Sequence, residues 1–135
     1  MRFRDQSRDL EKELEEKWVE LLTSVYMYVD WRKVARHHYA GDIFEHRVKM
    51  AASQPDIPSM VEHLCNLLGL QAPKLPLDAI NFLREHEDEA MYMLRRWTRL
   101  LSIQAVNRAI EIRKERKKKK NGGEVENVEE GGMNE

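Results

Sequence analysis

Apolar residues recur at steps of three and four near the start of the chain, and this spacing limits the possible folds more than any other feature. The repeat comprises Leu10, Leu14, Trp18, Leu21, Leu22, Val25, Tyr26 and Val29. Such steps place side chains on one face of a helix with 3.6 residues per turn. No run of strand length alternates apolar and polar residues, so the sequence predicts an all-α protein.

Helix-capping residues predict where the next helices start. Asp30 is expected to cap a short second helix, and Gly41 is expected to interrupt it. Asp42 followed by Glu45 has the pattern of a capping box, in which each residue satisfies a free backbone N–H of the first turn. A third helix is therefore expected from Asp42 to about Ala52.

Prolines predict two loops, at residues 53–59 and 72–76, because the residue before a proline disfavours the helical conformation. Between them, Ser59 and Glu62 form a second capping box, which predicts the start of a fourth helix. Gly69 is expected to close that helix, since glycine readily adopts the left-handed conformation that ends helices.

From Leu77 the chain is expected to stay helical to about residue 120, with one break in the charged turn 85–88. The last helix, about 88–120, has two apolar stripes. The first contains Met91, Leu94, Trp97, Leu101, Ala105, Ala109 and Ile112; the second contains Leu100, Ile103 and Ile110. A helix with two stripes packs on two sides. It is therefore either the central helix of the domain or a helix that also contacts a second subunit.

These elements predict one domain, a bundle of five or six helices over residues 1–120. Residues 121–135 contain five acidic residues, no basic residue and two Gly-Gly pairs, which predicts a disordered acidic tail. This tail would either fold back on the cations before it and weaken polyanion binding, or serve only as solubilising charge.

Positive charge is concentrated just before that tail. Residues 91–120 carry eleven basic and two acidic residues, a net charge of +9, although the whole chain has a net charge of −1. The predicted nucleic-acid-binding residues are Arg95, Arg96, Arg99, Arg113, Lys114, Arg116, Lys117, Lys118, Lys119 and Lys120. On one continuous helix, Arg95, Arg99, Arg113 and Lys117 would lie close to one azimuth and form a cationic edge. Such an edge binds phosphates through counterion release, without reading sequence.

No catalytic residue, cofactor site or metal site is predicted. His38, Asp42 and His46 have helical spacing, but the expected break at Gly41 separates them, and a metal site needs three or four converging ligands. The single cysteine, Cys65, lies on an apolar stripe, which indicates a small core residue. No glycine-rich phosphate loop, nucleophile elbow or dinucleotide fingerprint is present.

The sequence therefore predicts a non-enzymatic, nucleic-acid-associated helical protein, an accessory subunit of a nucleoprotein complex. It would bind DNA or RNA backbones through its basic helix. The alternative is a protein–protein or self-association module that uses Leu100, Ile103 and Ile110, with the lysines as solubilising charge. The absence of a secretory signal or a long apolar run predicts a cytoplasmic protein without membrane contact. The high Lys, Arg and Glu content is typical of thermophilic proteins.

Overall fold

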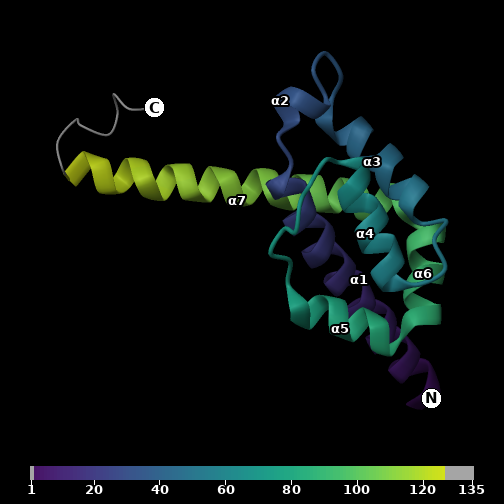
Figure 1. Ribbon diagram of the computed structural model, residues 1–135. Coiled ribbons are helices and arrows are strands. Elements are labelled where there is room, and N and C mark those ends of the chain that lie inside the picture. The colour runs from purple at the N-terminus through teal and green to yellow at the C-terminus, as the bar shows by residue number, and fades with distance from the viewer. Residues whose placement is uncertain (1, 127–135) are drawn as a thin grey trace.

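The computed structural model describes residues 2–126, with side chains described for residues 8–119, and contains seven helices and no strand in that range. The all-α prediction is confirmed, with one helix more than the upper expectation (Figure 1). The helices are α1 (Arg2–Tyr28), α2 (Trp31–Val34), α3 (Ala40–Ala51), α4 (Ile57–Leu67), α5 (Leu77–Glu85), α6 (Glu87–Arg96) and α7 (Thr98–Glu126).

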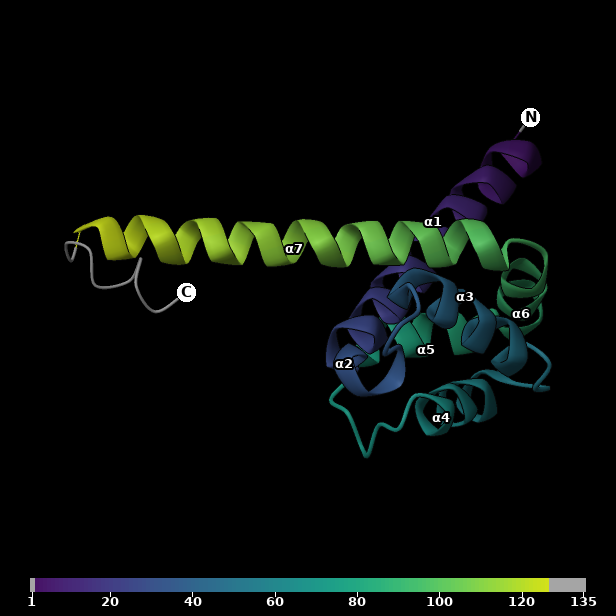
Figure 2. The same cartoon turned by 90° about the horizontal axis from the view of Figure 1, so that it is seen from above.

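The core forms around α1, which crosses α7 and also packs against α5 and α6, while α3 packs against α7 and α4 (Figures 1 and 2). The predicted apolar face is buried from Leu14 to Tyr26 in α1, and Val29, just past the end of the helix, is buried as well. Trp18 is fully buried, and its indole Nε1 donates a hydrogen bond to the carbonyl of Ala90 in α6 at 2.9 Å. This bond satisfies the one polar atom of the indole, so the ring can be buried without an unpaired donor.

The capping box predicted at Asp42 and Glu45 is wrong. Helix α3 begins two residues earlier, with Tyr39 as N-cap, and Gly41 lies inside its first turn. A Cβ on Gly41 would lie 3.9 Å from a methyl carbon of Val106 in α7, so the glycine sits where the two helices approach closely. Gly41 therefore lies at a contact between α3 and α7 and does not interrupt a helix.

The start of α4 also differs from the prediction, because Asp56 rather than Ser59 is the N-cap. The Asp56 carboxylate accepts a hydrogen bond from the Ser59 N–H at 2.8 Å, and Pro58 stands in the first turn, where its missing N–H costs nothing. The predicted end of α4 is confirmed. Gly69 has a φ of +72°, and the Leu70 N–H bonds to the Cys65 carbonyl at 2.8 Å, as in a Schellman motif.

A break at Trp97 divides the expected last helix into α6 and α7. The Thr98 hydroxyl donates to the Leu94 carbonyl at 2.6 Å, and that carbonyl is the acceptor that a continuous helix would offer to the Thr98 N–H. Hydrogen bonding of a threonine side chain to the carbonyl four residues before it bends helices. The other expected break, in the turn 85–88, is confirmed at His86.

Helix α7 passes over the body of the molecule, and its C-terminal half extends well beyond the other helices (Figure 2). It is helical to Glu126, so the first six residues of the expected disordered tail belong to the helix. The remainder of that tail, residues 127–135, lies outside the described residues. Within residues 2–126, none of the helices has both the length and the apolar content needed to cross a membrane.

Candidate functional site

The extending part of α7 carries a dense group of exposed cations, which we call the basic end (residues 113–119). It contains six basic residues and one acidic residue, Glu115, for a net charge of +5. All seven residues are exposed. Among the side chains that the structure describes, the ion pairs are Lys17–Glu20 and Arg108–Glu111, so no described carboxylate pairs with a cation of the basic end.

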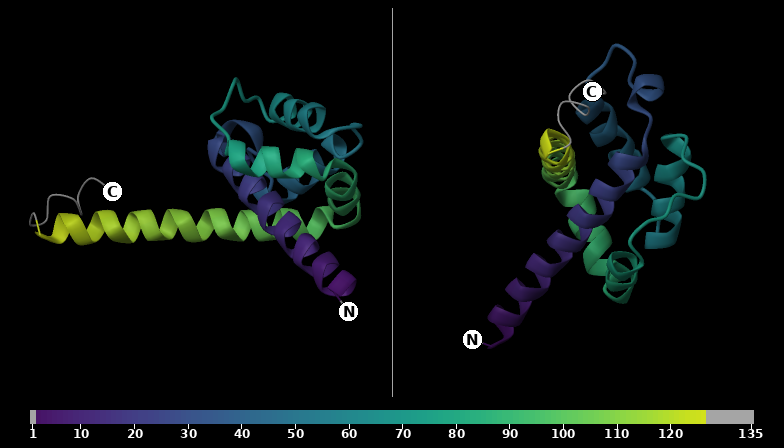
Figure 3. Two further views of the ribbon diagram at one scale, coloured as in Figure 1. Left: turned by 90° about the horizontal axis from the view of Figure 1, so that it is seen from below. Right: turned by 90° about the vertical axis from the view of Figure 1, so that its left-hand side faces the viewer.

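The cations of the basic end surround the helix instead of forming a single edge. Consecutive residues of an α-helix are rotated by about 100°, so Arg116, Lys117, Lys118 and Lys119 point in four directions around the axis. The left panel of Figure 3 shows this part of α7 extending free of the other helices. A rod with charge on all sides can be approached by phosphates from any direction.

Arg95 and Arg96 do not belong to this rod, which corrects the expected edge. Both lie on α6, which the break at Trp97 turns away from α7. The Arg95 guanidinium donates to the carbonyls of Ala52 and Gln54, each at 2.8 Å, and so caps the C-terminal end of α3. The guanidinium carbon of Arg96 lies 5.4 Å from the centre of the Trp97 ring. Of the predicted binding residues, Arg95 therefore has a structural partner.

Arg113 marks the place where α7 leaves the body. Its guanidinium carbon lies 5.9 Å from the centre of the Tyr26 ring, which belongs to the core. Burial raises the pKa of the Tyr26 phenol, and the positive charge of Arg113 offsets part of that rise. The cation–π contact holds one basic residue against the body, and the exposed residues after it extend into solvent.

The predicted second stripe lies on the face of α7 that points away from the body. Leu100, Ile103 and Ile110 keep 44%, 43% and 41% of their surface exposed. Viewed along α7, helices α2 to α5 lie to one side of it; on the other side the N-terminal part of α1 projects past the helix, and these three side chains lie exposed (Figure 3, right). We call this side, with Leu100, Ile103, Asn107 and Ile110, the outer face. The first stripe is buried as predicted at Leu101, Ala105 and Ala109.

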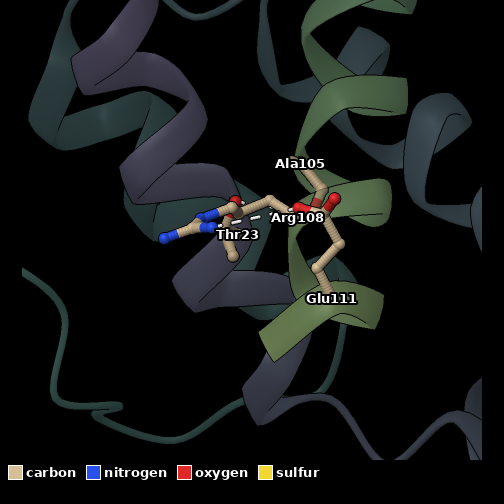
Figure 4. A network of polar contacts seen from close by, with 4 residues as sticks. All are labelled: Thr23, Ala105, Arg108 and Glu111. Carbon is tan, nitrogen blue, oxygen red and sulfur yellow. Dashed lines mark hydrogen bonds and ion pairs between the residues drawn. The ribbon is translucent and has the colours of Figure 1, made fainter. Parts of the chain in front are cut away.

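A groove of about 890 Å³ runs between α1 and α7 and does not extend the basic surface. The Thr23 hydroxyl donates to the Ala105 carbonyl at 3.4 Å where the two helices cross (Figure 4). Beside it, Arg108 pairs with Glu111 at 3.9 Å. Further carboxylates of α1 line the same groove, which makes it a poor surface for phosphates; they are Glu15, Glu16 and Glu20.

A second groove, about 580 Å³, lies between α1 and α6 at the corner where α6 meets α7, and we call it the corner groove. Its lining combines aromatic and apolar side chains with charged ones: Leu10, Leu14, Tyr92, Met93, Trp97, Arg8, Glu11, Asp88 and Glu89. Trp97 is 46% exposed and Tyr92 is 64% exposed, so the expectation that Trp97 is a core residue is wrong. The break in the helix rotates Trp97 out of the buried stripe and onto the surface.

The histidines and the cysteine do not assemble a reactive site in the part of the chain that the structure describes. No group of three or more His, Cys, Asp and Glu side chains there converges as a metal site requires. His38 precedes the start of α3, so it is not on the helix that carries Asp42 and His46. Cys65 is buried, and burial raises the pKa of its thiol, which disfavours the reactive thiolate.

Comparison with known proteins found no matching family model, no matching curated protein and no matching solved structure.

Proposed function

We propose that this protein binds nucleic acid through the basic end of α7, as a non-enzymatic accessory component of a nucleoprotein complex. The observation that supports this most is the set of six exposed cations on a helix that extends from the body, with no described carboxylate paired to them. A helix end needs only a few cations to complement its dipole. Six cations in seven residues exceed that need and match a polyanion.

The distribution of charge around the helix favours duplex DNA over a single strand. A helix lying in the major groove has phosphates on both flanks, and the major groove of B-form DNA is wide enough to admit an α-helix. The deep and narrow major groove of A-form RNA is not. Binding through phosphates would be independent of sequence, since phosphate contacts position a protein without specifying bases.

Three lysines on the free part of the helix provide the test. We expect anisotropy titrations with a 30-base-pair duplex to show affinity that falls steeply with salt. The variant Lys117→Gln/Lys118→Gln/Lys119→Gln should reduce the log–log slope by about 2 to 3, close to one per lost phosphate contact. Duplex RNA and single-stranded DNA of the same length should bind more weakly than duplex DNA.

The matched control removes the same charge from the body of the protein. Lys33, Lys49 and Lys74 are exposed and lie outside α7. Replacing these three with glutamine should leave the slope within about 0.5 of the wild type, because they do not face the same phosphates. Equal slopes for both triple variants, or an affinity independent of salt, would overturn the proposal.

A second candidate function is protein–protein association through the outer face of α7. It is favoured by Leu100, Ile103 and Ile110, which share one uncovered face of one helix and each keep more than two-fifths of their surface exposed. Apolar residues that line up on one helix face usually meet another surface.

A further inference from the structure

We propose that two copies of this protein associate antiparallel along α7, so that the outer faces meet and the basic end of each copy reaches the corner groove of the other. The proposal rests on the second candidate function and adds to it the partner, the orientation and the groove. Three features of the described residues support it: the spacing on the outer face, the placement of charge along α7, and the chemistry of the corner groove.

The outer face has the residue spacing of a helix–helix seam. Leu100, Ile103, Asn107 and Ile110 follow one another at steps of three, four and three, which is the a/d pattern of a heptad repeat. This pattern places them in one line facing a second helix. Asn107 is the one polar residue in the line; with Leu100 opposite Ile110 it lies level with Ile103 of the other copy, so it does not help to select the register.

Charge decides the orientation. In a parallel pair the two basic ends would lie side by side and bring a charge of +5 against another +5. Like charges at this separation repel unless a polyanion lies between them. In an antiparallel pair the basic ends lie at opposite ends of the dimer, so this repulsion is removed.

The antiparallel arrangement leads each basic end toward the corner groove of the other copy. With Leu100 of one copy opposite Ile110 of the other, residue 112 lies level with Thr98 at the start of the opposing α7. The basic end then passes the corner at Trp97, which lines the groove. At 1.5 Å per residue, residues 113–119 extend about 10 Å past that start.

The corner groove has the chemistry to hold a lysine or arginine side chain. Its lining carboxylates are Glu11, Asp88 and Glu89, against one lining cation, Arg8. With Arg96 beside Trp97, the net charge at the groove is −1 opposite the +5 of the basic end. The exposed rings of Tyr92 and Trp97 add faces that attract cations. The contact of Arg96 with Trp97 within the chain shows that this ring already accepts a guanidinium.

The two-fold symmetry makes the outer-face contact and the corner-groove contact reciprocal, and it closes the assembly at two copies.

We expect sedimentation of the full chain to show a concentration-dependent monomer–dimer equilibrium. Ile103→Glu should weaken dimerisation at least 100-fold, because it places a carboxylate in the apolar seam. Glu11→Lys/Glu89→Lys should weaken it at least tenfold, and adding Lys117→Glu/Lys118→Glu to that variant should restore it to within about threefold of the wild type.

Glu62→Lys/Glu85→Lys is the matched control, since it makes the same charge change at exposed residues outside the groove and should alter the dimerisation constant by less than threefold. Thermal melts will test whether each variant is folded.

The orientation of the two copies is measured from the distance between spin labels on Lys114→Cys in a Cys65→Ser background. An antiparallel pair centred near residue 105 separates these labels by about 27 Å along the axis, whereas a parallel pair places them at one level.

Each outcome separates the two proposals. A wild type that stays monomeric at about 1 mM would overturn this inference and leave the second candidate function with a different protein as the partner. If Ile103→Glu abolishes dimerisation but Glu11→Lys/Glu89→Lys leaves it unchanged, the outer face remains an interface and the role of the corner groove is overturned. Labels at one level would overturn the antiparallel arrangement.

Discussion

Arg95 and Arg96 follow one another in the sequence, yet their side chains meet different surroundings. Arg95 reaches back to the end of α3 and donates hydrogen bonds to the carbonyl of its C-cap residue, Ala52, and to that of Gln54 in the following loop. Arg96 remains exposed beside Trp97. The same residue type therefore supports the fold at one position and stays available to a ligand at the next.

We expect Arg95→Ala to lower the free energy of unfolding by about 1 to 2 kcal/mol, because it removes two charge-assisted hydrogen bonds from a partly exposed site. Arg96→Ala should change that free energy by less than about 0.5 kcal/mol, as is usual for exposed positions. Urea denaturation of both variants measures the difference. Equal losses of stability would contradict the structural role assigned to Arg95.

Residue types alone predicted the cations of the basic end but not the role of Arg95. Counting charges finds basic residues, and the spacing of one continuous helix places Arg95 on the line of Arg99. The hydrogen bonds of Arg95 to Ala52 and Gln54 connect segments more than forty residues apart. No local pattern reports such a contact, so it became visible only in the folded structure.

At the scale of elements, the ends of helices decide which faces are presented. The apolar spacing of α1, the end of α4 at Gly69 and the break before α6 were predicted from local residues. The break at Trp97 was missed, because it contains neither glycine nor proline, the usual signals of interruption. Thr98 is the local signal that could have found it, since its hydroxyl competes for the Leu94 carbonyl.

The start of α4 gives a pH-dependent prediction. The hydrogen bond from the Ser59 N–H to the Asp56 carboxylate holds the pKa of that carboxyl below its ordinary value. A depressed native pKa means that the unfolded chain binds the proton more readily. The stabilisation by ionised Asp56 is therefore complete above the unfolded pKa of about 3.9 and is lost as the pH falls through the native value.

Asp56→Asn isolates this contribution, because asparagine also caps helices but does not titrate in this range. We expect the stability of the wild type relative to Asp56→Asn to decrease between pH 5 and pH 3, as measured by urea denaturation at both values. Glu87 accepts a hydrogen bond from the neighbouring Ile57 N–H at 2.8 Å and is present in both proteins, so its contribution to stability cancels in the comparison. A difference that stays constant with pH would show that Asp56 does not supply the cap in solution.

At the scale of the whole molecule, the packed body is distinct from a helix end that extends away from it. Among the side chains of α7 that the structure describes, the buried ones lie between Leu101 and Ala109, where α1 and α3 cover the helix. The basic end adds no buried side chain, and its cations repel one another. Stability should therefore depend on the first half of α7, and polyanion binding on the second.

The separation of these two halves can be measured in one pair of variants. Lys117→Gln/Lys118→Gln/Lys119→Gln should shift the melting temperature by less than about 2 °C, since exposed substitutions away from contacts rarely exceed 0.5 kcal/mol. Leu101→Ala should cost about 2 to 5 kcal/mol, because it leaves a cavity between α7 and the core. Calorimetry and the duplex titration on the same samples should thus show opposite effects. The lysine variant should keep its melting temperature and lose affinity for the duplex. Leu101→Ala should lose stability but, at temperatures where it is still folded, keep the wild-type salt dependence of duplex binding. If the lysine variant melted as early as Leu101→Ala, the basic end would have to contribute to the packed body in solution.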